Sequence, residues 1–383
     1  MITDWSAISP FGSGSAAFRG GMRARRPATA PVDPGLGEQP MDTAGLVPHF
    51  DARTALGRAN TRSMDRATAL AVATVGLMLK RSGPDATAAP PEGAEAGAGP
   101  SADGNIGLVL GTSNGSVHSM MGFTRDSMTM RRPYHVDPAR FPNTVMNCAA
   151  GRCAIQYGLR GPNTTIAGGH ATGLLALNYA VRLHRCGHAQ TLLCGAVEEY
   201  SANRAWLEWH AHAGSDHAAP NQNHDSDAGA LQPLGEGCAA FRLESPQAAR
   251  DGGRPVRAEL LALEFGVSGD GHPPQDVLAR CLKAAFAAAG ADPADLWAAA
   301  PAGYHDERGG QERAALDRLL GPGRRRLDPV GELIGDTSAA SACFQLAALL
   351  AEAERDGASA GRLGLVTTID REGLAGCALL RLA

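Results

Sequence analysis

The chain has 383 residues, of which 44% are hydrophobic and 19% charged, and its formal net charge is -4 at pH 7. These values are typical of a soluble globular protein whose core fills one large domain or two fused halves. The charge gives no electrostatic reason to expect binding to nucleic acid or to a membrane. A membrane span and a signal peptide are not expected, since no apolar run approaches about 18 residues and the N-terminus lacks a basic and then apolar pattern.

The first part of the chain alternates predicted strands and helices with loops. In chain order, these are a strand at 2–10, a helix at 15–22, a loop at 24–42, a core-facing helix at 64–80, a flexible surface insertion at 82–104 and a buried strand at 106–110. The stretch that follows, 113–141, is unusually rich in methionine and aromatic residues.

A strand, a sharp turn and a helix are predicted between Thr164 and Arg185. The strand ends at Ile166, three small residues follow at 167–169, and His170 opens a helical segment of low polarity. This order is typical of a nucleophile elbow, which holds one side chain at the mouth of a pocket beside a helix N-terminus. In enzymes that hold an acyl group there, the residue is usually Cys or Ser. His170 at this position is therefore the main clue to function.

The eight cysteines are dispersed in largely apolar contexts without a CxxC pair: Cys148, Cys153, Cys186, Cys194, Cys238, Cys281, Cys343 and Cys377. This usage predicts reduced, buried thiols in a cytoplasmic protein. Cys194 lies in the run TLLCGAV, which reads as a buried strand where a thiol is inert.

Residues 201–234 are polar and lack a period, and they carry four histidines: His210, His212, His217 and His224. Their spacing fits no strong zinc signature, so we interpret the segment as a surface loop and expect no metal. The later predicted elements are strands at 237–243, 256–264, 363–369 and 377–382, and helices at 274–289, 311–320 and 339–354. Strands alternating with buried helices indicate α/β layers.

Several motifs together resemble the β-ketoacyl synthase family. They are the Gly161-Pro162 pair before the elbow strand, ISPFGSG near the N-terminus, the stretches 50–79 and 147–161, GAVEE at 195–199 and GEGCAAFRLES at 235–245. The resemblance implies an α/β, thiolase-like fold with two similar halves, 1–240 and 241–383, in α-β-α-β-α layers. It also implies that His170 stands where the family has its catalytic Cys.

The resemblance further implies that two more catalytic groups are replaced. Ketosynthases use a Cys, two His and a Lys for decarboxylating condensation. The second His belongs to a Gly-His-Thr motif, and here Asp336 stands between Gly335 and Thr337. The position of the family's Lys corresponds to about Gly331, so the Lys is absent too.

The family's first His is also displaced. Glu312 matches an acidic residue of the family, and counting back from it puts that His near Ala300 or Pro301. His305 would reach the pocket only if the loop has shifted. The C-terminal motif at 368–376 carries charged residues where the family has a Phe- and Gly-rich loop.

These replacements predict that the chain alone lacks standard ketosynthase activity. An ionised Asp336 would repel an enolate, and acyl-imidazoles hydrolyse too readily for His170 to be a good acyl carrier. Because a helix N-terminus disfavours a cation, we expect His170 to be neutral.

One interpretation is a non-catalytic partner that resembles the chain-length factor (ketosynthase β) of type II polyketide synthases. It would form a heterodimer with an active ketosynthase in polyketide or fatty-acid-like chain elongation, with His170 as a polar plug. The usual chain-length factor has Gln at the elbow, so His170 is a departure. Substrate would arrive on the phosphopantetheine of an acyl carrier protein, with no cofactor bound. Five residues would line an acyl cavity, or would pack in the core or an interface: Met120, Met121, Phe123, Met128 and Met130.

An alternative is a divergent acyltransferase. His170 would act as base or transient nucleophile on a carrier-protein thioester, with Asp336 or His305 orienting it. A metal-binding or scaffold protein built on 201–224 is the third hypothesis.

Overall fold

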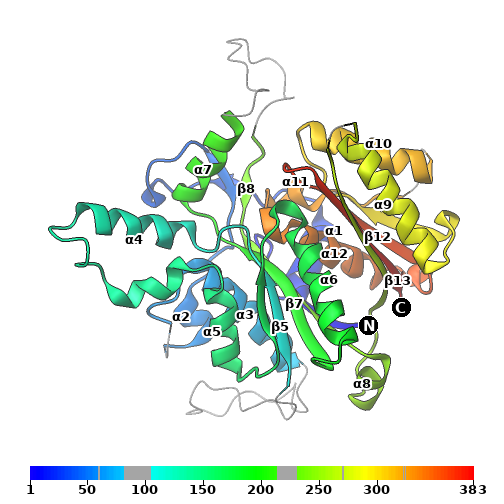
Figure 1. Ribbon diagram of the computed structural model, residues 1–383, viewed down its shortest axis with the longest axis horizontal. Helices are drawn as coiled ribbons and strands as arrows, with labels where there is room; N and C mark the ends of the chain where they lie inside the picture. Colours follow the sequence, from blue (N-terminus) through cyan, green and yellow to red (C-terminus); the bar gives the residue numbers. More distant parts are fainter. Residues whose placement is uncertain (59–60, 82–104, 214–230, 270, 322, 324) are drawn as a thin grey trace.

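The computed structural model describes residues 1–58, 61–81, 105–213, 231–269, 271–321, 323 and 325–383. The insertion expected at 82–104 lies outside these residues. The described chain is an α/β structure in which helices cover both outer faces of the strands and two helices lie between them (Figure 1). This is the layered, thiolase-like arrangement that we expected.

The first half of the large sheet has the order β1-β9-β7-β5-β6. Its strands are β1 (Ile2–Ser9), β5 (Gly107–Gly111), β6 (Asn163–Ile166), β7 (Thr191–Glu198) and β9 (Gly237–Glu244), and β2 (Gly12–Ser13) pairs with β1. The second half has the order β10-β13-β12-β11. Its strands are β10 (Ala258–Val267), β11 (Leu296–Ala300), β12 (Leu363–Ile369) and β13 (Leu374–Leu382).

The two halves repeat one pairing scheme. In each, the first strand pairs antiparallel with the last (β1 with β9, β10 with β13), and the last pairs antiparallel with the strand before it. That strand then has a parallel neighbour, β5 or β11. A single antiparallel contact between Ile2 and Ala258 joins the halves. Because β9 belongs to the first half, we propose that the division falls after Glu244 rather than at 240.

Helices fill the layers around the two halves. The central pair is α6 (Thr172–Arg185) and α12 (Ser341–Ala353), the outer pairs are α3 (Arg66–Arg81) with α5 (Cys148–Tyr157) and α9 (Pro274–Ala289) with α10 (Glu307–Leu320). The other α-helices are α1 (Ser15–Ala24), α2 (Ala52–Leu56), α4 (Val117–Thr129), α7 (Ala202–Ala213), α8 (Pro246–Asp251) and α11 (Val330–Ile334). The 3-10 turns are η1 (Pro34–Leu36), η2 (Pro138–Thr144), η3 (Gly169–Ala171), η5 (Pro293–Asp295), η6 (Ser338–Ala340) and η7 (Gly357–Ser359). A small sheet contains β3 (Ala30–Pro31), β4 (Thr43–Gly45) and β8 (Leu234–Gly235).

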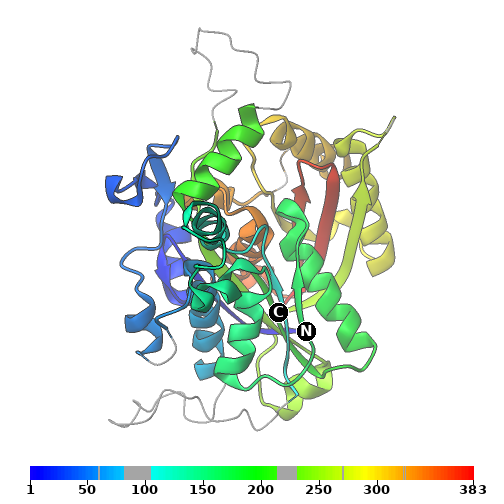
Figure 2. The same cartoon turned by 60° about the vertical axis from the view of Figure 1, so that its left-hand side comes forward.

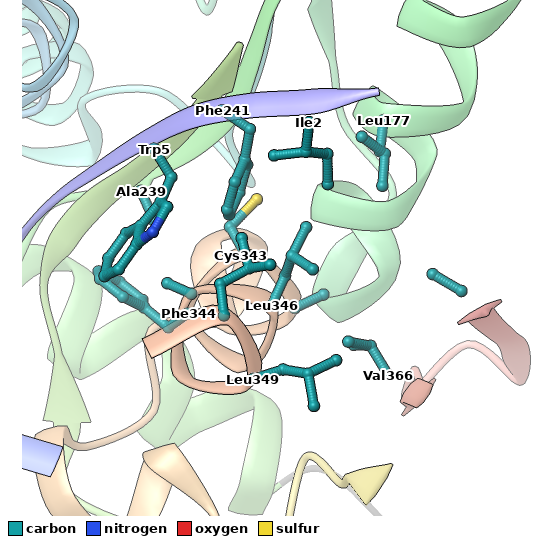
Figure 3. Close-up of a cluster of buried hydrophobic side chains, with 14 of the residues drawn as sticks. Ile2, Trp5, Leu177, Ala239, Phe241, Cys343, Phe344, Leu346, Leu349 and Val366 are labelled. Carbon is teal, nitrogen blue, oxygen red and sulfur yellow. The ribbon is translucent and has the colours of Figure 1, made fainter. Parts of the chain in front are cut away.

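The central layer is the most buried part of the molecule. The sequence of α12, SACFQLAALLAEA, is apolar on nearly all sides, and a helix of this kind is stable only when it is enclosed. Figure 3 shows Phe344 and Leu346 of α12 beside Phe241 and Trp5 of the first half, with Val366 of the second half close by. Both chain termini lie close together in the two views of Figures 1 and 2. The two halves therefore share one core through α6 and α12.

Most predicted elements are confirmed, with differences of a few residues at their ends. The prediction of an aperiodic loop throughout 201–234 was wrong, because α7 occupies Ala202–Ala213 and carries His210 and His212. Ala202, Ala205, Trp206 and Trp209 stand at helical spacing in this helix, a periodic signal that the interpretation of the polar segment as a loop overlooked. Within the part of the chain that the structure describes, no helix is both long and apolar enough to span a membrane.

Candidate functional site

The predicted elbow is present and is built from β6, the turn at 167–169 and η3, which leads into α6. Gly169 has φ +52°, in the left-handed region that glycine adopts readily. A Cβ atom at Gly169 would lie 2.0 Å from Oδ2 of Asp370, so this turn also requires a residue without a side chain. The result is a tight approach that places His170 in the interior, with 4% of its surface exposed.

His170 is held on both sides of its ring by carboxylates. Its Nε2 lies 3.0 and 3.1 Å from the two oxygens of Asp336, and its Nδ1 lies 3.3 Å from Oδ2 of Asp370. The main-chain N–H of His170 donates to the same Asp370 oxygen at 2.7 Å. Both aspartates are buried. Neither ring nitrogen is therefore left free to attack a thioester.

This arrangement shifts the pKa of His170 in the direction opposite to the one that the helix N-terminus predicts. Burial lowers the pKa of the imidazole, but the charge and hydrogen bonds of Asp336 and Asp370 outweigh burial, and the pKa lies above its usual value of 6.5. Burial likewise raises the pKa of both carboxyls, but His170 outweighs it: the pKa of Asp336 lies well below its usual range and that of Asp370 is lowered to about 2. The expectation of a neutral His170 considered the helix N-terminus alone, and the two carboxylates shift the pKa in the opposite direction.

Tyr304, in the β11–α10 loop, and Arg308, in the first turn of α10, close the site. The Tyr304 ring stands edge-on to His170, with 5.1 Å between ring centres, and its hydroxyl shares a hydrogen bond with Oγ1 of Thr368. Arg308 lies 4.0 Å above the Tyr304 ring and pairs with Asp306 at 2.8 Å. Nη1 of Arg308 is also 3.3 Å from Nδ1 of His170, a like-charge contact that lowers the pKa of the imidazole. The aspartates offset this repulsion.

His305 does not share this position. It is exposed and lines an open groove of about 700 Å³ together with Pro301 and Arg313. Its neighbour Tyr304 takes the place beside His170. The structure therefore brings together His170 and Asp336 of the expected set, but it leaves His305 on the surface.

Glu312, in α10, has a structural role beside the same loop. Its buried carboxylate accepts hydrogen bonds from the main-chain N–H groups of Ala302 and Gly303 and from Oγ1 of Thr367, at 3.0, 3.2 and 2.6 Å. These bonds tie the loop after β11 to the neighbouring strand β12. Burial raises the pKa of Glu312 despite them.

Comparison with known proteins agrees with this geometry. Residues 1–249 match the model of the family described as "Beta-ketoacyl synthase, N-terminal domain". The chain belongs to the β-ketoacyl synthase family. The solved structure of "The ishigamide ketosynthase/chain length factor" is similar with 40% sequence identity and a TM-score of 0.85, covering 100% of this chain and 98% of that chain.

Curated relatives of this ketosynthase-like chain are more distant. The 3-oxoacyl-[acyl-carrier-protein] synthase 2 of Rhizobium meliloti (strain 1021) is 28% identical, over 67% of this chain and 65% of its own length. The ketoacyl synthase alpha subunit of the tetracenomycin polyketide synthase of Streptomyces glaucescens is 29% identical, over 68% of this chain and 61% of its own length. The chain thus matches less than two thirds of the length of these relatives.

The methionine-rich residues of this β-ketoacyl synthase relative lie on an arm that projects from the body. The arm consists of α4 and η2, which lie side by side (Figure 1). Four of its residues have exposed fractions between 39% and 80%: Met120, Met121, Met128 and Met130. Phe123 packs against Phe141, with 5.9 Å between ring centres. This chain by itself therefore does not enclose them in a cavity.

Among the described residues, no group of three or more His, Cys, Asp and Glu side chains has an arrangement that could hold a metal ion. His217 and His224 lie outside these residues, while His210 stacks on Trp206 within α7.

Sequence reasoning missed three residues of the site: Asp370, Tyr304 and Arg308. The available signal for Asp370 was an acidic residue directly after the strand LGLVTTI, which we interpreted only as one of the charged residues that replace the family's Phe- and Gly-rich loop. Tyr304 and Arg308 carry no such signal, because their approach to His170 depends on the path of the β11–α10 loop.

The charges of this site predict how stability depends on pH. The folded pKa of His170 is raised, so its contribution is complete below the usual 6.5 and is lost as pH rises through the folded pKa. The folded pKa of Asp370 is lowered to about 2, so its contribution is present above 3.8 and is lost as pH falls toward 2. Denaturant unfolding of wild type and His170→Gln should differ most between these limits. A difference that grows above neutral pH would contradict the prediction.

Proposed function

We propose that this chain is a ketosynthase-like subunit without its own condensing activity, acting as chain-length factor beside an active ketosynthase in type II polyketide or fatty-acid-like elongation. One observation carries the proposal: the residue at the elbow is an imidazole held by carboxylates at both ring nitrogens. An imidazolium has no lone pair with which to take an acyl group. The elbow is thus filled by a charged structural group rather than a nucleophile.

The surroundings of His170 also oppose decarboxylating condensation. This step needs donors around the enolate, but the oxygens next to Nε2 of His170 belong to Asp336, an ionised acceptor. The buried Cys343 beneath the elbow offers no substitute, since burial raises the pKa of its thiol well above the usual value. A partner must therefore supply the chemistry.

The exposed arm supports such a partner. Large apolar side chains continue from the arm to α5, where Ile155 is 76% exposed, and to α7, where Trp209 is 43% exposed. Apolar surface gathered over neighbouring elements marks a protein interface more often than a free surface. The similar ishigamide structure is described as a ketosynthase/chain length factor. We propose that the arm packs on a ketosynthase subunit and that the two together border the acyl cavity.

The growing chain would reach this heterodimer on the phosphopantetheine of an acyl carrier protein, and the proposed role of this subunit requires no cofactor. Its effect would be steric, because the shape of a shared cavity limits how long a chain the partner can extend. Condensation itself would use the partner's thiolate.

The first experiment is the native mass of the full chain, expressed alone and together with a ketosynthase encoded beside it. We expect a 1:1 complex on coexpression. Met128→Asp places a charge in the proposed contact and should weaken the complex, whereas Asp276→Asn, on the distant α9, should not. A stable homodimer that ignores the ketosynthase would sink the proposal.

A second candidate function is acyl transfer by this chain, and the His170–Asp336 contact favours it because paired His and Asp can share proton transfer. The two functions differ in what they need from His170. The double variant His170→Gln with Asp336→Asn removes the proton-transfer pair together with both charges. We expect its complex with the ketosynthase to keep condensing. Loss of all turnover in a folded complex would favour the acyltransferase.

A further inference from the structure

The helix α7 contacts the His170 site through two charged side chains at separate positions. Arg204, in its first turn, is a buried cation with 1% of its surface exposed. Glu208, one turn further on, pairs with Arg371 at 2.6 Å. Arg371 directly follows Asp370, the carboxylate at Nδ1 of His170. Arg204 and Glu208 therefore connect one helix to the segments that carry the two aspartates.

Arg204 makes an unusual set of hydrogen bonds for a buried guanidinium. Its Nη1 donates to the main-chain oxygens of Glu199 and Gly235, both at 2.8 Å, and its Nη2 donates to the main-chain oxygen of Asp336 at 3.1 Å. Buried arginines ordinarily pair with a carboxylate, and forming these bonds must offset a large desolvation cost. Three carbonyls in a fork geometry suit Arg and not Lys, which has one nitrogen. We call these three hydrogen bonds of the Arg204 guanidinium the clamp.

The clamp acts on the main chain of Asp336. The main-chain oxygen of Asp336 also accepts a hydrogen bond from the N–H of Gly235 at 2.8 Å. The main-chain N–H of Asp336 donates to the main-chain oxygen of Pro233 at 2.7 Å. The N–H of Ser338 donates to Oδ1 of Asp336 at 2.7 Å, which turns the carboxylate toward His170. With the main chain fixed on one side and the side chain on the other, Asp336 has one orientation.

We propose that α7 is the positioning element of the site, with Arg204 holding Asp336 and the Glu208–Arg371 pair holding the turn of Asp370 against His170. This inference rests on the proposed function only in treating His170 as a charged structural group. It does not require a ketosynthase partner. Its consequence is that a shift of α7, whose Trp206 and Trp209 are partly exposed, would change the charge of His170.

The test is the pKa of His170 in the full chain, followed by NMR of labelled imidazoles and assigned with His170→Gln. Arg204→Met removes a cation, and Arg371→Gln removes another. If these residues acted only through their charge, each substitution would leave the pKa of His170 unchanged or higher. If they position the aspartates, each lets a carboxylate move away, and the pKa should fall by about one unit for Arg204→Met and less for Arg371→Gln.

Two further variants serve as controls. Arg308→Gln removes the cation that faces Nδ1 directly and should raise the pKa of His170, which shows that the measurement resolves both signs. Arg204→Lys keeps the charge, but the Lys side chain cannot reach three carbonyls. The pKa of His170 in this variant should therefore stay close to its value in Arg204→Met. If Arg204→Met does not fold, Arg371→Gln decides alone. An unchanged or higher pKa in the folded variants overturns the inference, whatever the native-mass experiment shows about a partner.

Discussion

Replacing His170 by Leu should lower the free energy of unfolding by about 3–5 kcal/mol at pH 7, because it leaves two buried carboxylates without their cation. Leu has a similar volume and adds no polar group, so the loss reflects charge rather than a cavity. Asp336 and Asp370 would then repel each other across the vacated imidazole position. The cations Arg204 and Arg308 would remain beside Asp336 and offset only part of this repulsion. Urea unfolding followed by circular dichroism measures the change.

The same variant should invert the acid dependence of stability. Two carboxylates in one buried site cannot both ionise easily, so the folded pKa of one of them rises above 3.8. Its contribution to stability is then present below 3.8 and lost as pH rises, which is opposite to wild type. His170→Leu should therefore lose less stability than wild type on acidification.

A second substitution separates charge from packing. His170→Leu with Asp336→Asn removes the repulsion, while Asp370 keeps the hydrogen bonds from the main-chain N–H groups of residue 170 and Glu372. Replacing a whole buried ion cluster by neutral groups is often close to neutral, so most of the lost stability should return. Asp276→Asn, in the exposed pair with Arg318, should change stability by less than about 1 kcal/mol. If the double variant is no more stable than His170→Leu, the cluster does not act through charge.

The fold was largely predictable because its elements are encoded by local pattern. TLLCGAV and LGLVTTI are continuous apolar runs, and both form strands buried on both faces. The helix at 274–289 shows its apolar positions at helical spacing and has the bounds we expected. The helix α7 was missed although Ala202, Ala205, Trp206 and Trp209 stand at helical spacing, because this short pattern is set in a polar, histidine-rich segment that was interpreted as a loop.

The site was predictable only where chain neighbours define it. The strand, the glycine turn and His170 follow one another, and their geometry follows from backbone sterics. The charge of His170 instead depends on Asp336 and Asp370, which lie 166 and 200 residues away in the sequence. Without knowing that both carboxylates reach one ring, helix polarity alone favoured a neutral imidazole. The tertiary contact outweighs this local effect because the ion pairs are buried and close.

A second buried acid should respond in the opposite way to neutralisation. Glu199 lies between β7 and α7. Its carboxylate accepts hydrogen bonds from two groups at the start of α4: Oγ of Ser116 at 3.0 Å and the N–H of His118 at 3.2 Å. Burial, together with the neighbouring charges of Asp65 and Glu198, raises its pKa from 4.5 to about 8. The folded protein must therefore take up a proton at neutral pH. No stability is lost to this proton uptake below pH 4.5, and the loss grows as the pH rises from 4.5 through 8.

Glu199→Gln should consequently stabilise the protein by about 3 kcal/mol at pH 7 and by little at pH 4, since the amide keeps an acceptor for Ser116 and carries no charge to bury. Glu236 provides the matched control, because it is equally buried but pairs with Arg66 through two hydrogen bonds. Glu236→Gln should destabilise the protein at both pH values. Opposite signs for two neighbouring Glu→Gln substitutions would show that a cation partner, and not burial alone, decides whether a buried carboxylate stabilises this fold. Equal losses for both variants at pH 7 would contradict the raised pKa of Glu199.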